Sequence, residues 1–177
     1  MTTPTPTIRR LHALSDADLH GLAALLLDVV DGGASVSFMA PLARDTALAF
    51  WRGVGDEVGQ GARALLVAED AQGIVGTVQL ILRLPENQPH RADLAKMLVH
   101  RRARRQGLGA ALMRAAESLA RACGKTLLVL DTVTGGDGER LYASLGWQRV
   151  GSIPNYALYP DGRPCASTYF YRALGDS

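Results

Sequence analysis

The sequence has few of the features that would place a protein in a membrane or outside the cell. Its longest uncharged apolar run, Gly21 to Leu27, is far shorter than the roughly 20 residues that span a bilayer. Met1 to Thr7 lacks the apolar core of a secretory signal. The two cysteines, Cys123 and Cys165, lie far apart without a CxxC motif, which favours buried thiols over a disulfide. We therefore expect a cytoplasmic protein that makes no contact with membranes.

Aromatic residues are also scarce, at 6% of 177 residues, and the formal net charge is only +2. The charge is unevenly placed, because residues 90–105 hold six basic side chains and one acidic one, whereas the rest of the chain is mildly acidic. These basic residues are Arg91, Lys96, Arg101, Arg102, Arg104 and Arg105. A local basic cluster indicates an anionic ligand at one place, and without interleaved aromatic residues it does not favour nucleic acid.

The chain is long enough to bury the core of one globular domain over residues 1–177, with 1–7 as a flexible tail. The predicted helices begin at Ser15, Pro41, Leu108 and Asp137 and end near Asp31, Gly59, Gly124 and Leu145. The predicted strands are Ile8–Leu11, Ala64–Ala68, Ile74–Leu82, Ala92–Val99, Thr126–Leu130, Trp147–Gly151 and Thr168–Tyr171. Asp70 to Gly73 suits a hairpin turn, and residues 92–130 suit a strand, helix and parallel strand. This order predicts an α/β fold, with a mixed sheet and helices on both faces.

The most informative stretch is Arg101 to Gly109, RRARRQGLG, between a predicted strand and a predicted helix. The first turn of a helix leaves backbone N–H groups unpaired, glycines let a ligand approach the backbone, and arginines match phosphate oxygens. The segment is therefore predicted to bind a pyrophosphate group, and a solvated charged turn is the alternative. Neither a Walker loop nor a dinucleotide fold is expected, because their full motifs are absent.

The segment Arg104 to Gly109 resembles the Arg/Gln-x-x-Gly-x-Gly/Ala signature of the GNAT superfamily of N-acetyltransferases. Glu139 to Trp147 is similar to a second segment of that superfamily, in which a tyrosine precedes a Gly-aromatic pair. The resemblance implies a mostly antiparallel sheet with one central parallel strand pair, and acetyl-coenzyme A (acetyl-CoA) as cosubstrate without a metal. It also implies an oxyanion-binding N–H near Leu98 or Val99. The implied cofactor-binding residues are Met97, Leu98, Val99, Arg104, Arg105, Gln106, Gly107, Leu108 and Gly109.

Within the superfamily, the chain resembles the tabtoxin resistance family, which acts on a small amino-acid-like toxin. The resemblance is carried by Gly32 to Val36, Phe38 to Ala40, Arg91-Ala92, Leu130 to Thr132 and Pro160 to Arg163. It implies a small amine acceptor and a role in detoxifying a toxin or antibiotic. The implied substrate-binding residues are Gly33, Ala34, Ser35 and Phe38, and the implied catalytic residues are Asp93, Asp131 and Tyr142. The family has Glu where this chain has Asp93, which favours proton transfer through water at that position.

The chemistry of amine acetylation suits these three catalytic candidates. An amine with a pKa near 10 must lose a proton before it attacks, and carboxylates can bind the cation and relay the proton. A phenol such as Tyr142 can donate a proton to a leaving thiolate. The structural alternatives are a turn or helix cap for Asp131, a salt bridge with Arg91 for Asp93, and a core position for Tyr142.

The remaining signals favour a small-molecule enzyme over other classes. The histidines (His12, His20, His90 and His100) form no metal-ligand spacing, and Ser35 and Ser37 lack the glycine elbow of a hydrolase. The alternative function is a coenzyme A binding regulatory module with little turnover. The expected partners are acetyl-CoA and a small amine, and the sequence carries no signal for an oligomeric state.

Overall fold

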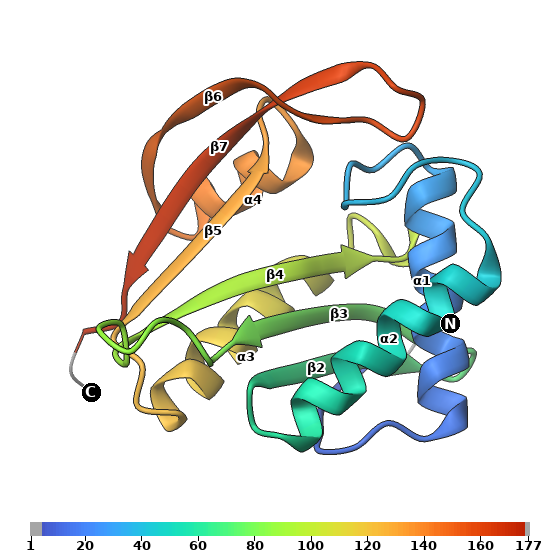
Figure 1. Ribbon diagram of the computed structural model, residues 1–177, viewed down its shortest axis with the longest axis horizontal. Helices are drawn as coiled ribbons and strands as arrows, with labels where there is room; N and C mark the ends of the chain where they lie inside the picture. Colours follow the sequence, from blue (N-terminus) through green and yellow to red (C-terminus); the bar gives the residue numbers. More distant parts are fainter. Residues whose placement is uncertain (1–4, 176–177) are drawn as a thin grey trace.

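A seven-stranded sheet runs through the computed structural model, which describes residues 5–175 (Figure 1). The strands are β1 (Thr7–Leu11), β2 (Arg63–Asp70), β3 (Gly73–Ile81), β4 (Arg91–Val99), β5 (Leu127–Val133), β6 (Gln148–Leu158) and β7 (Pro164–Ala173). Their order is β1-β2-β3-β4-β5-β7-β6, and every neighbouring pair is antiparallel except β4 and β5. The predicted mixed sheet with one central parallel pair is confirmed. Residues 1–4 of the predicted tail lie outside the described residues, and Thr7 already belongs to β1.

Helices cover both faces of this sheet, as predicted. They are α1 (Asp16–Asp31), α2 (Arg44–Gly59), α3 (Leu108–Ala122), α4 (Asp137–Ser144) and the short 3-10 helix η1 (Arg101–Ala103). One buried cluster joins Leu26 of α1 and Trp51 of α2 to the sheet, and a second joins Leu112 of α3 and Tyr142 of α4 to its other face. Among residues 5–175, no helix has the length and apolar character needed to cross a membrane.

The two N-terminal helices differ in how well the sequence predicts their starts. Ser15 caps α1 in a reciprocal capping box with Asp18, as its sequence pattern indicates. The predicted start of α2 at Pro41 is wrong, because this helix begins at Arg44. The Ala40 N–H donates to the Pro160 carbonyl at 3.1 Å, which holds this part of the chain against the β6–β7 turn rather than in a helix.

The two C-terminal strands are longer than the sequence predicts. Strand β6 continues to Leu158 and is exposed along almost its whole length, so its residues do not alternate between apolar and polar. A bulge between Ile153 and Ala157 places three residues of β6 opposite one of β7, and Asn155 there has φ +53°. Strand β5 also continues beyond its predicted end, so Asp131 lies inside it, opposite Tyr169 of β7.

The parallel pair β4–β5 opens after three residue pairs, from Arg91↔Leu127 to Asp93↔Val129. Beyond that point the two strands diverge, as the ribbon shows (Figure 1). Strand β4 is irregular on its other side too, because its register with β3 shifts between Thr77 and Gln79. Lys96 lies within this β4 bulge and has φ +49°. The unpaired edges of β4 and β5 leave an opening near the centre of the sheet.

Candidate active site

A cavity of about 1060 Å³ occupies this opening between β4 and β5. Its walls come from the second half of β4, the end of β5, the first turn of α3, and α4. The loop between α1 and α2 and the β6–β7 hairpin line it as well. Most of the predicted site residues lie on its walls, namely Gly33, Ala34, Ser35, Phe38, Met97, Leu98, Val99, Arg104, Arg105, Gly107, Leu108, Gly109, Asp131 and Tyr142.

The start of α3 provides one end of the cavity. Gly107 is its N-cap with φ +79°, and no side chain caps the helix. The N–H groups of Leu108, Gly109 and Ala110 find no acceptor within residues 5–175, so they are free to bind an anion. Gly109 has a further role, because a Cβ there would lie 3.1 Å from Leu141 Cδ2. This turn fits the predicted pyrophosphate site.

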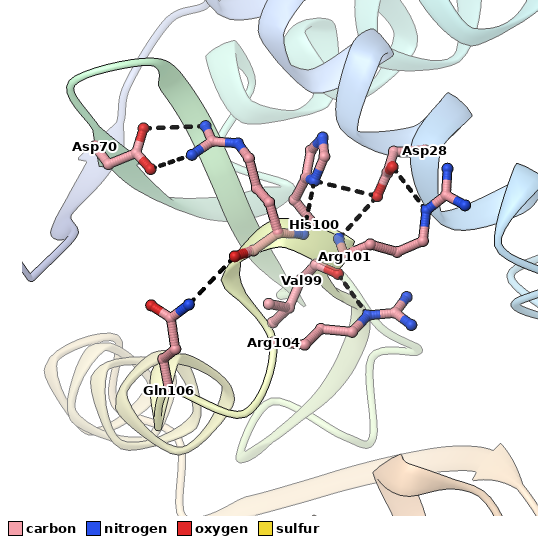
Figure 2. A network of polar contacts seen from close by, with 8 residues as sticks. Asp28, Asp70, Val99, His100, Arg101, Arg104 and Gln106 are labelled. Carbon is pink, nitrogen blue, oxygen red and sulfur yellow. Dashed lines mark hydrogen bonds and ion pairs between the residues drawn. The ribbon is translucent and has the colours of Figure 1, made fainter. Parts of the chain in front are cut away.

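Two of the four clustered arginines serve the protein rather than a ligand. Figure 2 shows Arg101 beside Asp28, and the Arg101 Nε donates to Asp28 Oδ1 at 2.9 Å. Arg102 forms an ion pair with Asp70 and lowers the pKa of that carboxyl group. Gln106, predicted to bind the cofactor, does not line the cavity, and its Nε2 donates to the Arg102 carbonyl at 3.2 Å. Part of the basic cluster predicted from the sequence therefore forms ion pairs within the protein, and only the remainder is available to a ligand.

The other two arginines lie on the cavity wall. Arg105 is the more exposed, with 83% of its side chain accessible and a 3.3 Å contact to Asp137. The Arg104 Nε donates to the Val99 carbonyl at 3.2 Å (Figure 2). The next N–H, that of His100, donates to Val75 of β3 at 2.8 Å. The backbone N–H groups of successive residues in a strand point to opposite sides. Since the His100 N–H points toward β3, the Val99 N–H points away from β3, toward the opening.

Asp131 is the negative charge on the other end of the cavity. Its side chain is exposed, and Ser167 Oγ of β7 donates to its Oδ2 at 2.7 Å. Its field contributes to raising the pKa of both Tyr142 and Tyr169. No helix begins at Asp131, so the helix-cap alternative for this residue does not apply.

Asp93 lies where β4 and β5 are still paired, and it does not line the cavity. Arg91 forms an ion pair with it, which is the structural alternative that the sequence offered. Burial raises the pKa of the Asp93 carboxyl, Arg91 opposes this, and Asp131 adds to it. The structure therefore brings the two aspartates within electrostatic range but gives only Asp131 direct access to a ligand.

Tyr142 combines a core position with a place on the cavity wall. Its ring centroid lies 6.1 Å from those of Trp147 and Phe170, and only 5% of the residue is exposed. Its hydroxyl makes no hydrogen bond with residues 5–175. Burial, with a smaller effect from Asp131, raises the pKa of this phenol well above its ordinary value of 10, so it keeps its proton.

Tyr156 and Tyr169, two residues near Asp131, were missed by the sequence analysis, and Lys96 was noted there only as a member of the basic cluster. The Tyr156 and Tyr169 hydroxyls are 2.7 Å apart, and their hydrogen bond, with burial and Asp131, raises the pKa of Tyr169 to about 12. Tyr156 and Lys96 both line the cavity, and both lie in bulges. No local motif marks a bulge of this kind, so the sequence did not indicate that the side chains of Lys96 and Tyr156 would line the cavity.

The loop between α1 and α2, called the covering loop below, lines the cavity and is tied to the β6–β7 hairpin. Ser35 Oγ donates to the Leu158 carbonyl at 2.7 Å, which ties the loop to β6. Phe38 packs edge-to-face on Phe50 of α2, with ring centroids 5.2 Å apart. Gly33, with φ +86°, allows the chain to turn from α1 into this loop.

Comparisons with known proteins agree on one family. Residues 61–149 match the acetyltransferase (GNAT) domain. An uncharacterized N-acetyltransferase from the hisH-hisA intergenic region of Azospirillum brasilense is 35% identical over 127 residues, which cover 71% of this chain and 74% of that protein.

Two solved structures share the fold. An N-acetyltransferase from Staphylococcus aureus Mu50 has a TM-score of 0.79 at 17% identity, covering 97% of this chain and 100% of that one. A presumed acetyltransferase from Salmonella typhimurium, solved with its cofactor acetyl-CoA, has a TM-score of 0.77 at 22% identity, covering 98% and 96%.

Proposed function

The chain belongs to the GNAT family and is an acetyl-CoA-dependent N-acetyltransferase, and from this premise we propose that it acetylates the primary amine of a small, amino-acid-like molecule. The observation that carries this proposal is the loop at the Asp131 end of the cavity, which we call the acceptor end. The loop of residues 32–40 is tied across it through Ser35 to Leu158 and through Ala40 to Pro160. A covered cavity suits a small molecule better than a protein tail, which needs an open groove.

The other end of the cavity fits the second substrate, acetyl-CoA. The free N–H groups of the α3 first turn and the side chains of Arg104 and Arg105 would hold its pyrophosphate. The unpaired edge of β4 from Met97 to Val99 would hold its extended arm through backbone hydrogen bonds. When bound, acetyl-CoA supplies a thioester carbonyl that an amine can attack.

Asp131 is assigned to the acceptor amine. An amine with an ordinary pKa near 10 is protonated at neutral pH, and the Asp131 carboxylate attracts that cation. A carboxylate is a much weaker base than an amine, so Asp131 directs the proton into water that carries it to solvent. Asp93 lies outside the cavity, and Arg91 neutralises much of its charge. It is therefore assigned as a positioning residue that acts through Asp131 and does not touch the amine.

Val99 and Tyr142 are assigned to the acetyl group. The Val99 N–H points into the opening, where it can donate to a carbonyl oxygen that gains negative charge. Tyr142 keeps its proton at neutral pH and has a hydroxyl free to donate to the leaving sulfur. Its raised pKa makes complete transfer of the proton to that sulfur less favourable, so Tyr142 stabilises the departing thiolate by donating a hydrogen bond to it.

Small-molecule detoxification is the biological role that the tabtoxin resistance resemblance favours, and it extends this proposal. The acceptor loop residues Gly33, Ala34, Ser35 and Phe38, on which that resemblance partly rests, all line the cavity. A toxin or antibiotic with a primary amine would then be inactivated by loss of its positive charge.

The test is an acceptor panel with acetyl-CoA in which thiol release is measured. Amino acids, small amines, aminoglycosides and short peptides are compared, and mass spectrometry identifies the acetylated nitrogen. We expect free amino-acid-like amines to have the highest kcat/KM. Acetylation of peptides alone would overturn the proposal. Binding of coenzyme A without turnover of any amine would favour a regulatory module instead.

A further inference from the structure

Lys96 is a cation on the acceptor side of the cavity that the mechanism above does not use. It lies in the β4 bulge with φ +49°, and it lines the cavity. Its Nζ donates to Ser37 Oγ of the covering loop at 3.0 Å and lies 5.7 Å from the centre of the Phe50 ring. The bulge therefore directs a lysine toward the covering loop rather than toward bulk solvent.

The ammonium group of Lys96 lacks a carboxylate partner. Within residues 5–175, no carboxylate lies at ion-pair distance from its Nζ, and one hydroxyl uses one of its three donors. Burial lowers the pKa of Lys96, Arg63 lowers it further, and Asp131 partly opposes both. A half-buried ammonium with free donors is costly unless an anion approaches it. A ligand can supply that anion.

Lys96 also changes the charge balance of the acceptor end. Asp131 carries the negative charge that lines the cavity there, because Asp93 is paired with Arg91 behind the wall. A ligand with only a positive charge meets repulsion from Lys96, and a ligand with only a negative charge meets repulsion from Asp131. A molecule with both charges complements both side chains.

We propose that Lys96 binds a carboxylate of the acceptor, so that the substrate is a zwitterion with its amine toward Asp131 and its carboxylate between Lys96 and Ser37. This rests on the proposed function and narrows its substrate class to free amino acids and close analogues. Ser37 Oγ can turn its hydroxyl proton toward the same carboxylate. Lys96 is then a specificity-determining residue, and it takes no part in the transfer of the acetyl group.

The test compares amino acids with their carboxamides, which keep the amine and lose the negative charge. For the best amino acid of the panel, kcat/KM is measured for both forms in the wild type, Lys96→Gln, Lys96→Arg and Lys125→Gln. Lys125 is the matched control, because its Nζ donates to the Pro89 carbonyl at 2.7 Å, outside the cavity. Melting temperatures with and without coenzyme A establish that each variant is folded.

We expect the wild type to prefer the acid over its carboxamide by roughly 10-fold to 100-fold, the value of a hydrogen bond to a charged group. Lys96→Gln should abolish the preference for the acid over its carboxamide, because the KM for the acid rises. Lys96→Arg should retain most of the ratio, and Lys125→Gln should retain all of it.

Two results would overturn the role of Lys96 while the proposed function stands. In one, carboxamides or simple amines are acetylated as well as the acids by the wild type. In the other, folded Lys96→Gln keeps the wild-type ratio. Absence of turnover with every small amine is a different result, because it removes the proposed function and this inference with it.

Discussion

The two ends of the cavity are built from different parts of the peptide. The α3 end is made of backbone: free N–H groups behind Gly107, with arginines at their flank. The acceptor end is made of side chains that two bulges and a covering loop bring together, including Lys96, Asp131 and Tyr156. Backbone binding suits a ligand that never changes, whereas side chains can be exchanged to suit a new acceptor.

Removing the acceptor-end charge should have the largest effect. Asp131→Asn keeps the shape of the side chain, and we expect kcat/KM for the amine to fall about 100-fold to 1000-fold, within the range of general acid–base assistance. Coenzyme A affinity should change little. Asp56→Asn, an exposed carboxylate on α2, is the control. Wild-type kinetics for Asp131→Asn would mean that the amine loses its proton in solvent before it binds.

The Tyr142 hydroxyl should come next. We expect Tyr142→Phe to lower kcat about 100-fold with little change in acetyl-CoA affinity, because it removes one donor and keeps the ring. Steady-state kinetics and a thermal melt separate the two roles of this residue. Tyr171→Phe removes a hydroxyl from a residue that is 40% exposed and outside the cavity. If kcat stays constant while the melting temperature falls, Tyr142 belongs to the core alone.

Changing the backbone end should act on binding instead of turnover. Gly107→Val strains a residue with φ +79° and moves the first turn, so we expect coenzyme A affinity to fall about 10-fold or more. Gly124→Val is a matched control, because Gly124 follows the other end of α3 with φ +73° and equally open surroundings. Calorimetry with coenzyme A measures both. Equal loss in the two variants would assign the effect to strain in α3.

The smallest effect is expected at Asp93. Because Asp93 does not line the cavity, Asp93→Asn should change kcat/KM by no more than about 3-fold, far less than the Asp131 variant. Its raised pKa means that the folded state disfavours the charged form. The contribution of Asp93 to the free energy of unfolding is fully present below the pKa that it has in the unfolded state. This contribution is lost as the pH rises through the pKa that it has in the folded state. The difference in melting temperature between Asp93→Asn and the wild type should therefore be more favourable to the variant at pH 7 than at pH 4.

The sequence predicts the α3 end of the cavity well because that end depends on local chemistry. Gly107 and Gly109 between a strand and a helix mark a turn whose N–H groups are free, whatever the rest of the chain does. The same reasoning overestimated the arginines, since Arg101 and Arg102 bind Asp28 and Asp70, which are distant in sequence. Such partners are not visible in a local motif.

The acceptor end was predicted less completely because it depends on register. Lys96 enters the cavity only because β4 carries an extra residue relative to β3, and Tyr156 does so only because β6 bulges opposite β7. Both effects come from pairing with other strands, and a shift of one residue moves a side chain to the opposite face. Asp131 was predicted because the segment Leu130 to Thr132 carries a family resemblance.

The close packing of Gly109 against Leu141 fixes how near α3 lies to α4. It holds the first turn of α3 against α4, the helix that carries Tyr142, at a separation that a Cβ on residue 109 would increase. In the binding mode proposed for acetyl-CoA, this packing sets the position of the pyrophosphate site relative to the helix that carries Tyr142. A Cβ on residue 109 is therefore expected to move the proposed pyrophosphate site relative to Tyr142, and so to shift the sulfur of bound acetyl-CoA away from this hydroxyl.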